Sequence, residues 1–180
     1  MGIFNIFKSN NSNPECENII NEEETKLDYF ELIDKIDKNM YVNDDLAQKL
    51  FEKAYVLTAN DTVNRHFFYN KIIEYYYGLR EKQQDALEIC IKYCNESIAH
   101  TPKFLKSDKD MHYQNQYDYE YRPPRIPAFQ RLAIIHENEK NYKKAIKICE
   151  LALSLNLRDG TKGGFEGRKN RLSKKLIKHD

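Results

Sequence analysis

A helical frame that recurs three times along the chain limits the fold of these 180 residues more than any other feature. In each copy an aromatic residue is followed, 16 or 17 positions later, by an alanine, and a larger side chain stands four positions after that alanine. The three sets are Phe30, Ala47 and Phe51; Tyr69, Ala86 and Cys90; and Phe129, Ala145 and Cys149. The alanine lets two helices approach closely, and the larger residue fills the space beside the next pair. Self-similarity over tens of residues predicts stacked helical repeats.

Apolar residues at helical spacing predict the helices around these anchors. The expected pairs span residues 27–57, 67–98 and 127–155. A last amphipathic segment, about residues 165–178, places Phe165, Leu172 and Leu176 on one stripe and predicts a capping helix. Strand patterns are weak throughout. We therefore expect an all-α fold, an α-α superhelix of about three stacked helix hairpins that forms a single domain over residues 23–180.

The third pair has the most specific sequence pattern. Its stretch AFQRLAIIHENEKNYKKAIKICELALSLN resembles a tetratricopeptide repeat over residues 128–157, with Phe129, Ala133 and Ala145 at the family's aromatic and small positions. Residues 67–98 and 27–57 match less fully, because Ile73 and Asp34 stand where the family prefers a small residue. A plain helical hairpin is the alternative interpretation of the first pair. The resemblance implies a TPR-like protein-interaction module in which the first helix of each pair lines a concave groove.

The resemblance also implies which side chains line that groove. Carried over by position, they are Glu31 and Lys35 from the first pair, Phe67, Asn70, Glu74 and Tyr77 from the second, and Gln130, Ile134 and Glu137 from the third. Some family members hold a peptide's terminal carboxylate with Lys and Asn side chains. Only Asn70 matches that pattern, so we expect a peptide or helix with apolar and basic side chains instead. The competing interpretation is that Tyr75, Tyr76 and Tyr77 pack between helices.

A tyrosine-rich stretch separates the second and third pairs. Ala86 and Ala145 are 59 residues apart, whereas Ala47 and Ala86 are 39 apart, which indicates an insertion at about residues 99–126. Tyr117, Tyr119 and Tyr121 would lie on one side of an extended chain. We expect these rings to pack on the helical stack and partly cover the groove, with Arg122 and Arg125 at its edge. The polar stretch SDKDMH before them is interpreted as a loop.

The residues that could support catalysis or metal binding do not form a recognisable site. Cys90 and Cys94 are one helical turn apart, but a structural zinc site needs four ligands, so we interpret both as core residues. No Ser or Cys nucleophile has a plausible base nearby, and no dinucleotide-binding motif is present. We therefore expect a non-catalytic protein without a cofactor or metal.

A glycine-rich stretch near the C-terminus supports an alternative function. In RDGTKGGFEGR, the backbone amides around Gly163 and Gly164, together with Lys162 and Arg168, could bind an anion at the start of a helix. The simpler interpretation is that Gly160 ends one helix and that Gly163 and Gly164 form the turn into the capping helix. The basic helix that follows could bind nucleic acid through phosphate contacts. Lys plus Arg (29) nearly balance Asp plus Glu (28), so no overall basic charge favours this alternative. We rank it below protein binding.

The two ends of the chain differ in charge and hydropathy. Residues 15–45 are mainly acidic and residues 158–180 mainly basic, which would permit self-association of copies. Residues 1–22 are interpreted as a flexible leader, whose apolar residues 1–8 could touch a membrane or a partner. No apolar run is long enough to span a bilayer, and four cysteines are too few for a disulfide scaffold. We therefore expect a cytoplasmic protein that binds another protein or peptide.

Overall fold

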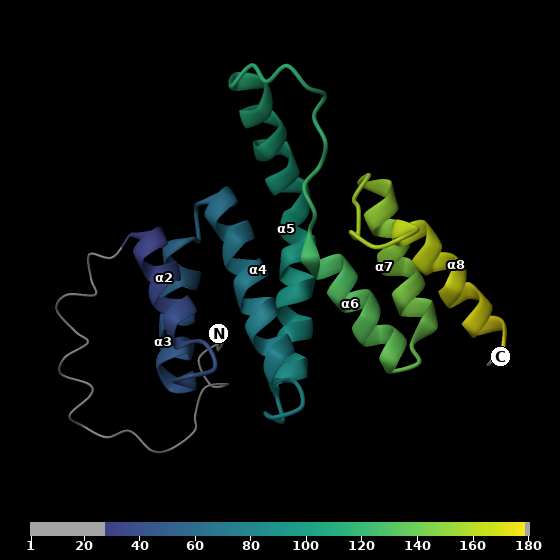
Figure 1. Ribbon diagram of the computed structural model, residues 1–180, viewed down its shortest axis with the longest axis horizontal. Helices are drawn as coiled ribbons and strands as arrows, with labels where there is room; N and C mark the ends of the chain where they lie inside the picture. The colour runs from purple at the N-terminus through teal and green to yellow at the C-terminus, as the bar shows by residue number, and fades with distance from the viewer. Residues whose placement is uncertain (1–27, 179–180) are drawn as a thin grey trace.

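The computed structural model describes residues 28–178, and throughout that range regular secondary structure is helical, with no strand. The helices are α2 (Tyr29–Asn39), α3 (Asp44–Leu57), α4 (Thr62–Leu79), α5 (Ala86–Gln114), α6 (Pro127–Asn138), α7 (Tyr142–Ser154) and α8 (Gly164–Ile177) (Figure 1). The expected all-α class and the C-terminal helix are confirmed. The predicted leader, residues 1–22, and its proposed membrane contact through residues 1–8 lie outside the described residues.

Short polar residues set the starts of the first three helices. The Asp28 side chain accepts a hydrogen bond from the amide of Glu31, and the Glu31 side chain accepts one from the amide of Asp28. Asn43 caps α3 through the amide of Leu46, and Asp61 caps α4 through two backbone amides. Pro127 occupies the first turn of α6, where its missing N–H costs nothing. These caps divide the chain into separate helices at the turns.

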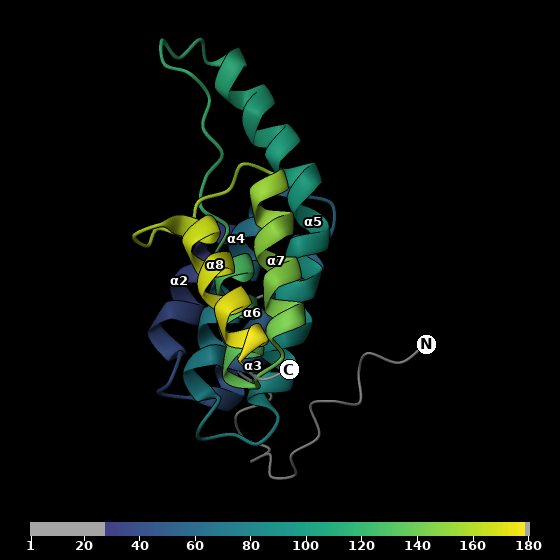
Figure 2. The same ribbon diagram turned by 90° about the vertical axis from the view of Figure 1, so that its right-hand side faces the viewer.

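Consecutive helices form antiparallel pairs, and each pair packs on the next. The closest associations are α2 with α3, α4 with α5, α6 with α7, and α7 with α8. Helix α5 also packs on α6, and α4 reaches α6 directly. Figure 2 looks along the stack and shows α5 and α7 on one side, with α2 and α8 on the other. The described chain is therefore a row of hairpins, in which α8 covers the last one.

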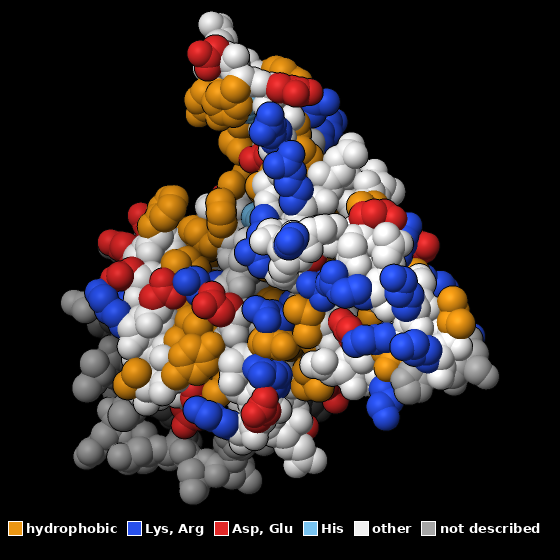
Figure 3. Space-filling model, turned by 45° about the vertical axis from the view of Figure 1, so that its right-hand side comes forward, with side chains coloured by type: hydrophobic (Ala, Val, Ile, Leu, Met, Phe, Trp, Pro, Cys, Tyr) orange, Lys and Arg blue, Asp and Glu red, His pale blue; other side chains and the backbone are white. Residues whose placement is uncertain are grey.

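Helix α5 differs from the expectation of a long irregular insertion over residues 99–126. It continues through Pro102 to Gln114, so SDKDMH is helical and only residues 115–126 connect α5 to α6. His100 Nε2 lies 2.8 Å from the carbonyl oxygen of Thr62, where α4 begins. Residues 101–114 extend the helix beyond this point by about 21 Å at 1.5 Å per residue. In Figure 3 this extension projects from the top of the molecule.

Packing explains why the helix continues past a proline. The ring of Phe104 is buried and stacks on His66 of α4, with ring centroids 3.7 Å apart. One turn earlier the Thr101 hydroxyl donates to the carbonyl oxygen of Ser97. Pro102 removes one backbone hydrogen bond, but burial of Phe104 stabilises the helix on the far side of the proline. A tertiary contact thus overrides a local signal that favours a break.

The predicted alanine frame is largely confirmed in the core. Ala47, Ala86 and Ala145 are all completely buried, and so are the larger residues four positions after the last two. Phe30 is the exception, because it is 74% exposed. Tyr29 is buried in its place, since the buried stripe of α2 runs through Tyr29, Leu32 and Ile36. The expected core position of Phe30 in the first helix was therefore wrong.

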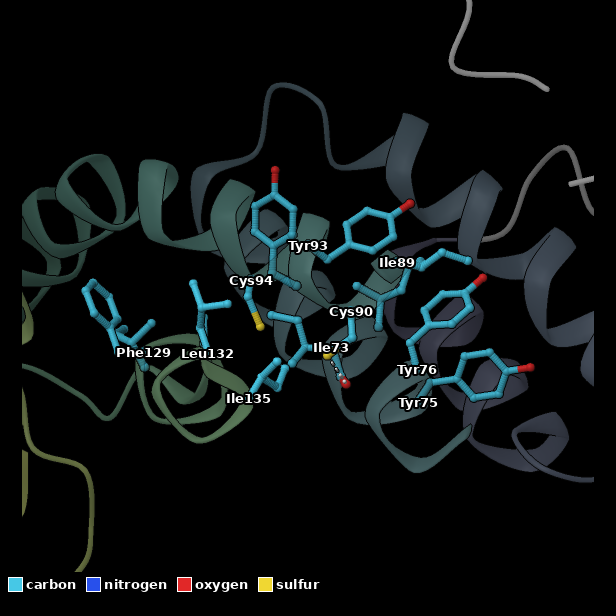
Figure 4. Close-up of a cluster of buried hydrophobic side chains, with 14 of the residues drawn as sticks. Ile73, Tyr75, Tyr76, Ile89, Cys90, Tyr93, Cys94, Phe129, Leu132 and Ile135 are labelled. Carbon is cyan, nitrogen blue, oxygen red and sulfur yellow. Dashed lines mark hydrogen bonds between the residues drawn. The ribbon is translucent and has the colours of Figure 1, made fainter. Parts of the chain in front are cut away.

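The core is continuous from α4 through α5 to α6. Figure 4 shows this arrangement, in which Cys90 and Cys94 of α5 lie between the tyrosines of α4 and the apolar face of α6. Cys90 Sγ lies 3.7 Å from the carbonyl oxygen of Ile73. Both thiols are free and buried, as the core interpretation predicted. Tyr75 and Tyr76 are also buried, so the packing interpretation holds for these two rings.

Tyr75 and Tyr76 are two of the three buried tyrosines of α4, and loss of their hydroxyl groups is expected to change stability in opposite directions. The Tyr75 hydroxyl donates to Asp44 Oδ1 at 2.8 Å, whereas the buried Tyr76 hydroxyl has no partner among the described residues. Because an unsatisfied buried hydroxyl is costly, Tyr76→Phe should raise the free energy of unfolding by about 1 kcal/mol. Tyr75→Phe should lower it by about 1 kcal/mol. Urea unfolding of the two variants measures both, and shifts in the same direction would contradict this account.

Candidate functional site

Helices α2, α4, α6 and α8 are joined side by side through polar side chains at the surface. Lys71 Nζ of α4 lies 2.8 Å from Asp37 Oδ1 of α2. The guanidinium carbon of Arg131 on α6 lies 3.8 Å from the ring centroid of Tyr77 on α4. We call the exposed and half-buried side chains of these four helices the even-helix face.

The link between α6 and α8 completes this row. Lys175 Nζ of α8 lies 2.6 Å from Glu137 Oε1 of α6, and this ion pair raises the pKa of Lys175. Arg171 stands one turn before Lys175 on the same stripe of α8. The face therefore extends over four helices and ends in a basic region.

The groove residues expected from the sequence all lie at the surface of the described structure. Phe67 is 52% exposed, Glu31 and Glu74 are exposed, and the others are half-buried, namely Lys35, Asn70, Tyr77, Gln130, Ile134 and Glu137. The structure brings Tyr77 to α6 and Glu137 to α8. All of these residues belong to α2, α4 or α6, and Tyr77 and Glu137 are the two that contact the next even-numbered helix.

Tyr77 is a structural link as well as a surface residue. Two guanidinium groups lie over its ring: Arg131 at 3.8 Å and Arg80 at 4.2 Å from the centroid. Arginine stacked on an aromatic ring stabilises a packed surface through a cation–π interaction. The sequence interpretation missed Arg131. An arginine beside the predicted groove residue Gln130 was the available signal.

Asn70, the one residue that matched the carboxylate clamp, is bound to the core instead. Its Nδ2 lies 3.0 Å from His66 Nε2, and its Oδ1 is buried. His66 is itself buried against Phe104. Burial, with a smaller contribution from His100, lowers the pKa of His66 to about 4. The neutral imidazole accepts from Asn70, which explains the orientation of the amide.

The buried histidine predicts a loss of stability in mild acid. Its pKa is about 4 in the folded chain and 6.5 in the unfolded one, so the unfolded chain binds more protons between those values. The contribution of neutral His66 to the free energy of unfolding should be fully present above pH 6.5. It should decrease by about 3 kcal/mol as the pH falls to 4. His66→Phe keeps the ring stack and should flatten this part of the profile. Chemical unfolding at pH 7 and pH 4.5 tests this, and an unchanged pH slope in the variant would contradict it.

The tyrosines of the connecting segment lie at the far end of α5, not over the groove as expected. Their rings surround His112, with centroids of Tyr117, Tyr119 and Tyr121 between 4.9 and 5.5 Å from its ring. His112 Nε2 lies 2.9 Å from the carbonyl oxygen of Tyr119, and the Tyr121 hydroxyl donates to Asp108 Oδ2 at 2.9 Å. The unexpected extension of α5 thus carries the rings away from α4 and α6.

The two arginines after these tyrosines lie nearer the body of the molecule. Arg122 is exposed. Arg125 donates to Gln130 of α6, and its guanidinium lies against Gly160, where an added Cβ would meet Nη1 at 3.4 Å. Gly160 has φ +71, a conformation that favours glycine. Arg125 therefore joins the start of α6 to the loop between α7 and α8.

The predicted anion site divides into a buried and an exposed part. Arg168 is buried and pairs with Asp159, with Nε 3.2 Å from Oδ2, and more loosely with Glu137 at 3.7 Å. Lys162, Gly163 and Gly164 are at or near the surface, and both glycines have positive φ at the start of α8. An open pocket of about 340 Å³ here is lined by Asp159 and Glu166 among others. The lining also includes Arg158, and Asp159 is paired with Arg168, so the pocket has no excess of positive charge that favours an anion.

Neither metal binding nor membrane insertion gains support from residues 28–178. That range contains no group of three or more His, Cys, Asp or Glu side chains placed to hold a metal ion. None of its helices combines the length and apolar character needed to cross a membrane. Comparison of the chain with protein-family models, curated proteins and solved structures gives no match.

Proposed function

We propose that the protein is a non-catalytic interaction module of the tetratricopeptide type, in which the even-helix face binds an extended segment of a partner protein. The observation that carries this proposal is the row of side-chain links that sets α2, α4, α6 and α8 beside one another. Stacked hairpins with one helix of each pair on a common surface provide an extended binding face. The alanine frame in the sequence supports the same arrangement.

The side chains of this face suit a segment with both apolar and charged groups. Phe67, Tyr77 and Ile134 present apolar surface, and Tyr77 and Arg131 already show that arginine and aromatic groups stack there. Aromatic residues and arginine dominate the energetics of protein interfaces. Binding is therefore expected to depend on the α4–α6 part of the face.

Affinity capture with variants of the face tests this function. Tyr77→Ala with Ile134→Glu should reduce partner recovery at least tenfold, because an aromatic anchor is lost and a charge enters an apolar contact. Lys147→Glu with Leu151→Ala alters exposed residues of α7 and should recover the partner as the unaltered chain does. Thermal unfolding verifies that all forms are folded. Equal recovery by the folded face variant would refute the proposal.

Nucleic-acid or anion binding through α8 is the second candidate. Arg171 and Lys174 are exposed and have no carboxylate partner among the described residues. If this function held, binding of a DNA or RNA duplex would fall steeply with salt and with Arg171→Ala plus Lys174→Ala. Fluorescence anisotropy of a labelled duplex at about 50 mM salt tests this candidate function, because phosphate contacts are strong at low salt. The interaction-module proposal expects no binding under those conditions.

A further inference from the structure

The projecting end of α5 and the segment after it form an exposed aromatic surface, which we call the tyrosine knob, residues 105–121. Tyr117 is 51% exposed and Tyr119 is 60% exposed, and Met111 and Tyr113 are exposed beside them. The knob stands clear of the other helices (Figure 1). Contiguous exposed apolar surface on a soluble domain marks an interaction site.

The knob is held in shape by its own interior. His112 is buried beneath the rings and lies within hydrogen-bonding distance of the Tyr119 carbonyl oxygen. The hydrogen bond from the Tyr121 hydroxyl to Asp108 of α5 fixes the Tyr121 ring. Tyr117 stacks on Tyr119, with ring centroids 5.4 Å apart. Because the exposed rings are ordered before binding, a partner would gain their contact area at a low cost in conformational entropy.

Unpaired carboxylates surround these rings. Asp110, Asp118 and Glu120 are exposed and have no cationic partner within the described range. In Figure 3, acidic and hydrophobic side chains meet at the tip of the projection, basic side chains lie below the tip on its shaft, and further Lys and Arg side chains gather over the middle and right of the molecule. Lys106 and Lys109 of α5 are exposed on this shaft. The part of the knob that carries Asp118 and Glu120 is therefore best complemented by a surface with arginine and lysine.

The chain itself supplies such a surface at the α6–α8 end of the even-helix face. Arg131 of α6 already stacks on a tyrosine, and Arg171 and Lys174 of α8 are exposed. Arginine can stack on tyrosine rings and pair with carboxylates at the same time. We propose that the tyrosine knob of one molecule binds the α6–α8 part of the even-helix face of a second copy. This inference rests on the proposed function, because it names an occupant of the same face.

The occupant comes from another molecule because the knob cannot reach its own face. Residues 105–114 are the rigid end of a helix that points away from the body, and the connecting segment is fixed again at the buried Ile126. Two copies can each place a knob on the other's face, which gives a closed pair with two identical contacts. The expected assembly is a dimer whose stability falls with salt.

A charge exchange between the two surfaces tests the proposal with the full chain. Sedimentation velocity at about 100 μM protein should show a dimer, since contacts in the micromolar range are populated there. Asp118→Lys with Glu120→Lys, and separately Arg171→Glu with Lys174→Glu, should each give monomers. An equimolar mixture of the two variants should restore the dimer, because both contacts again join opposite charges. A control, Lys143→Glu with Lys144→Glu on α7, should dimerise normally.

Two results would overturn the inference. One is a monomeric unaltered chain under these conditions. The other is a dimer that persists in both charge variants, which would place the contact elsewhere. Tyr117→Ser with Tyr119→Ser adds a test that charge repulsion cannot explain, and it should weaken dimerisation at least tenfold. If the unaltered chain captures the partner protein in a manner that depends on Tyr77 and Ile134 but forms no dimer, only this inference fails and the proposed function stands.

Discussion

Phe68→Ala is expected to lower the free energy of unfolding by about 3 to 5 kcal/mol, because it leaves a cavity where α3, α4 and α5 meet. Phe68 is completely buried, and three aromatic rings from α3 and α5 pack around it. Their centroids lie 5.6 Å away for Tyr55, 6.1 Å for Tyr93 and 6.3 Å for Phe51. Urea-induced unfolding monitored by circular dichroism measures the loss.

The neighbouring phenylalanine provides the matched control for this substitution. Phe67 precedes Phe68 directly but is 52% exposed on the even-helix face. Phe67→Ala removes the same atoms without a buried cavity, so its cost should stay below about 1 kcal/mol. Comparable losses for both variants would show that α4 is not oriented as described.

The second large effect is expected at the ion pair that attaches α8. Asp159 is buried and accepts hydrogen bonds from the Thr161 amide at 2.8 Å and from the Thr161 hydroxyl at 2.6 Å. Its second oxygen accepts from Arg168 Nε at 3.2 Å. Asp159→Ala leaves the buried guanidinium with only Glu137 at 3.7 Å. The expected cost is about 3 to 5 kcal/mol of unfolding free energy, measured by chemical unfolding.

The pH dependence of this pair gives an independent check. Burial alone would raise the pKa of Asp159, but hydrogen bonds from Thr161 and Arg168 hold it below its usual value. A carboxyl group with a depressed folded pKa stabilises the fold above its unfolded pKa, and this stabilisation is lost as the pH falls through the folded pKa. In Asp159→Asn, the free energy of unfolding should therefore depend less on pH on the acid side than it does in the unaltered chain. An exposed control, Glu166→Gln, should leave that dependence unchanged.

The helical organisation was predictable because it depends on spacing. Three buried alanines, Ala47, Ala86 and Ala145, mark the second helix of each pair. Larger side chains would not fit where two helices cross closely, so the small residue is visible in the sequence. Helix starts were also readable at Asp28, Asn43 and Asp61, where the side chain caps its own helix. Such features are local, so they appear in the sequence directly.

The features that the sequence did not predict depend on contacts between distant segments. Helix α5 continues past Pro102 because Phe104 packs on His66. No local sequence pattern predicts that contact. Arg168 was assigned to an anion site because glycines precede it, yet its charge is balanced internally by Asp159. The stacking of Arg131 on Tyr77 joins residues of different helices, and only the fold reveals it.

Site-specific photo-crosslinking tests the central claim, that the even-helix face is the binding surface. A photoreactive residue is placed at Ile134 on α6 or, as a control, at Lys147 on α7 of the full chain. The protein captured by the unaltered chain should crosslink from position 134 and not from position 147. Crosslinks from position 147 alone, or equal yields from both positions, would contradict the assignment of the face.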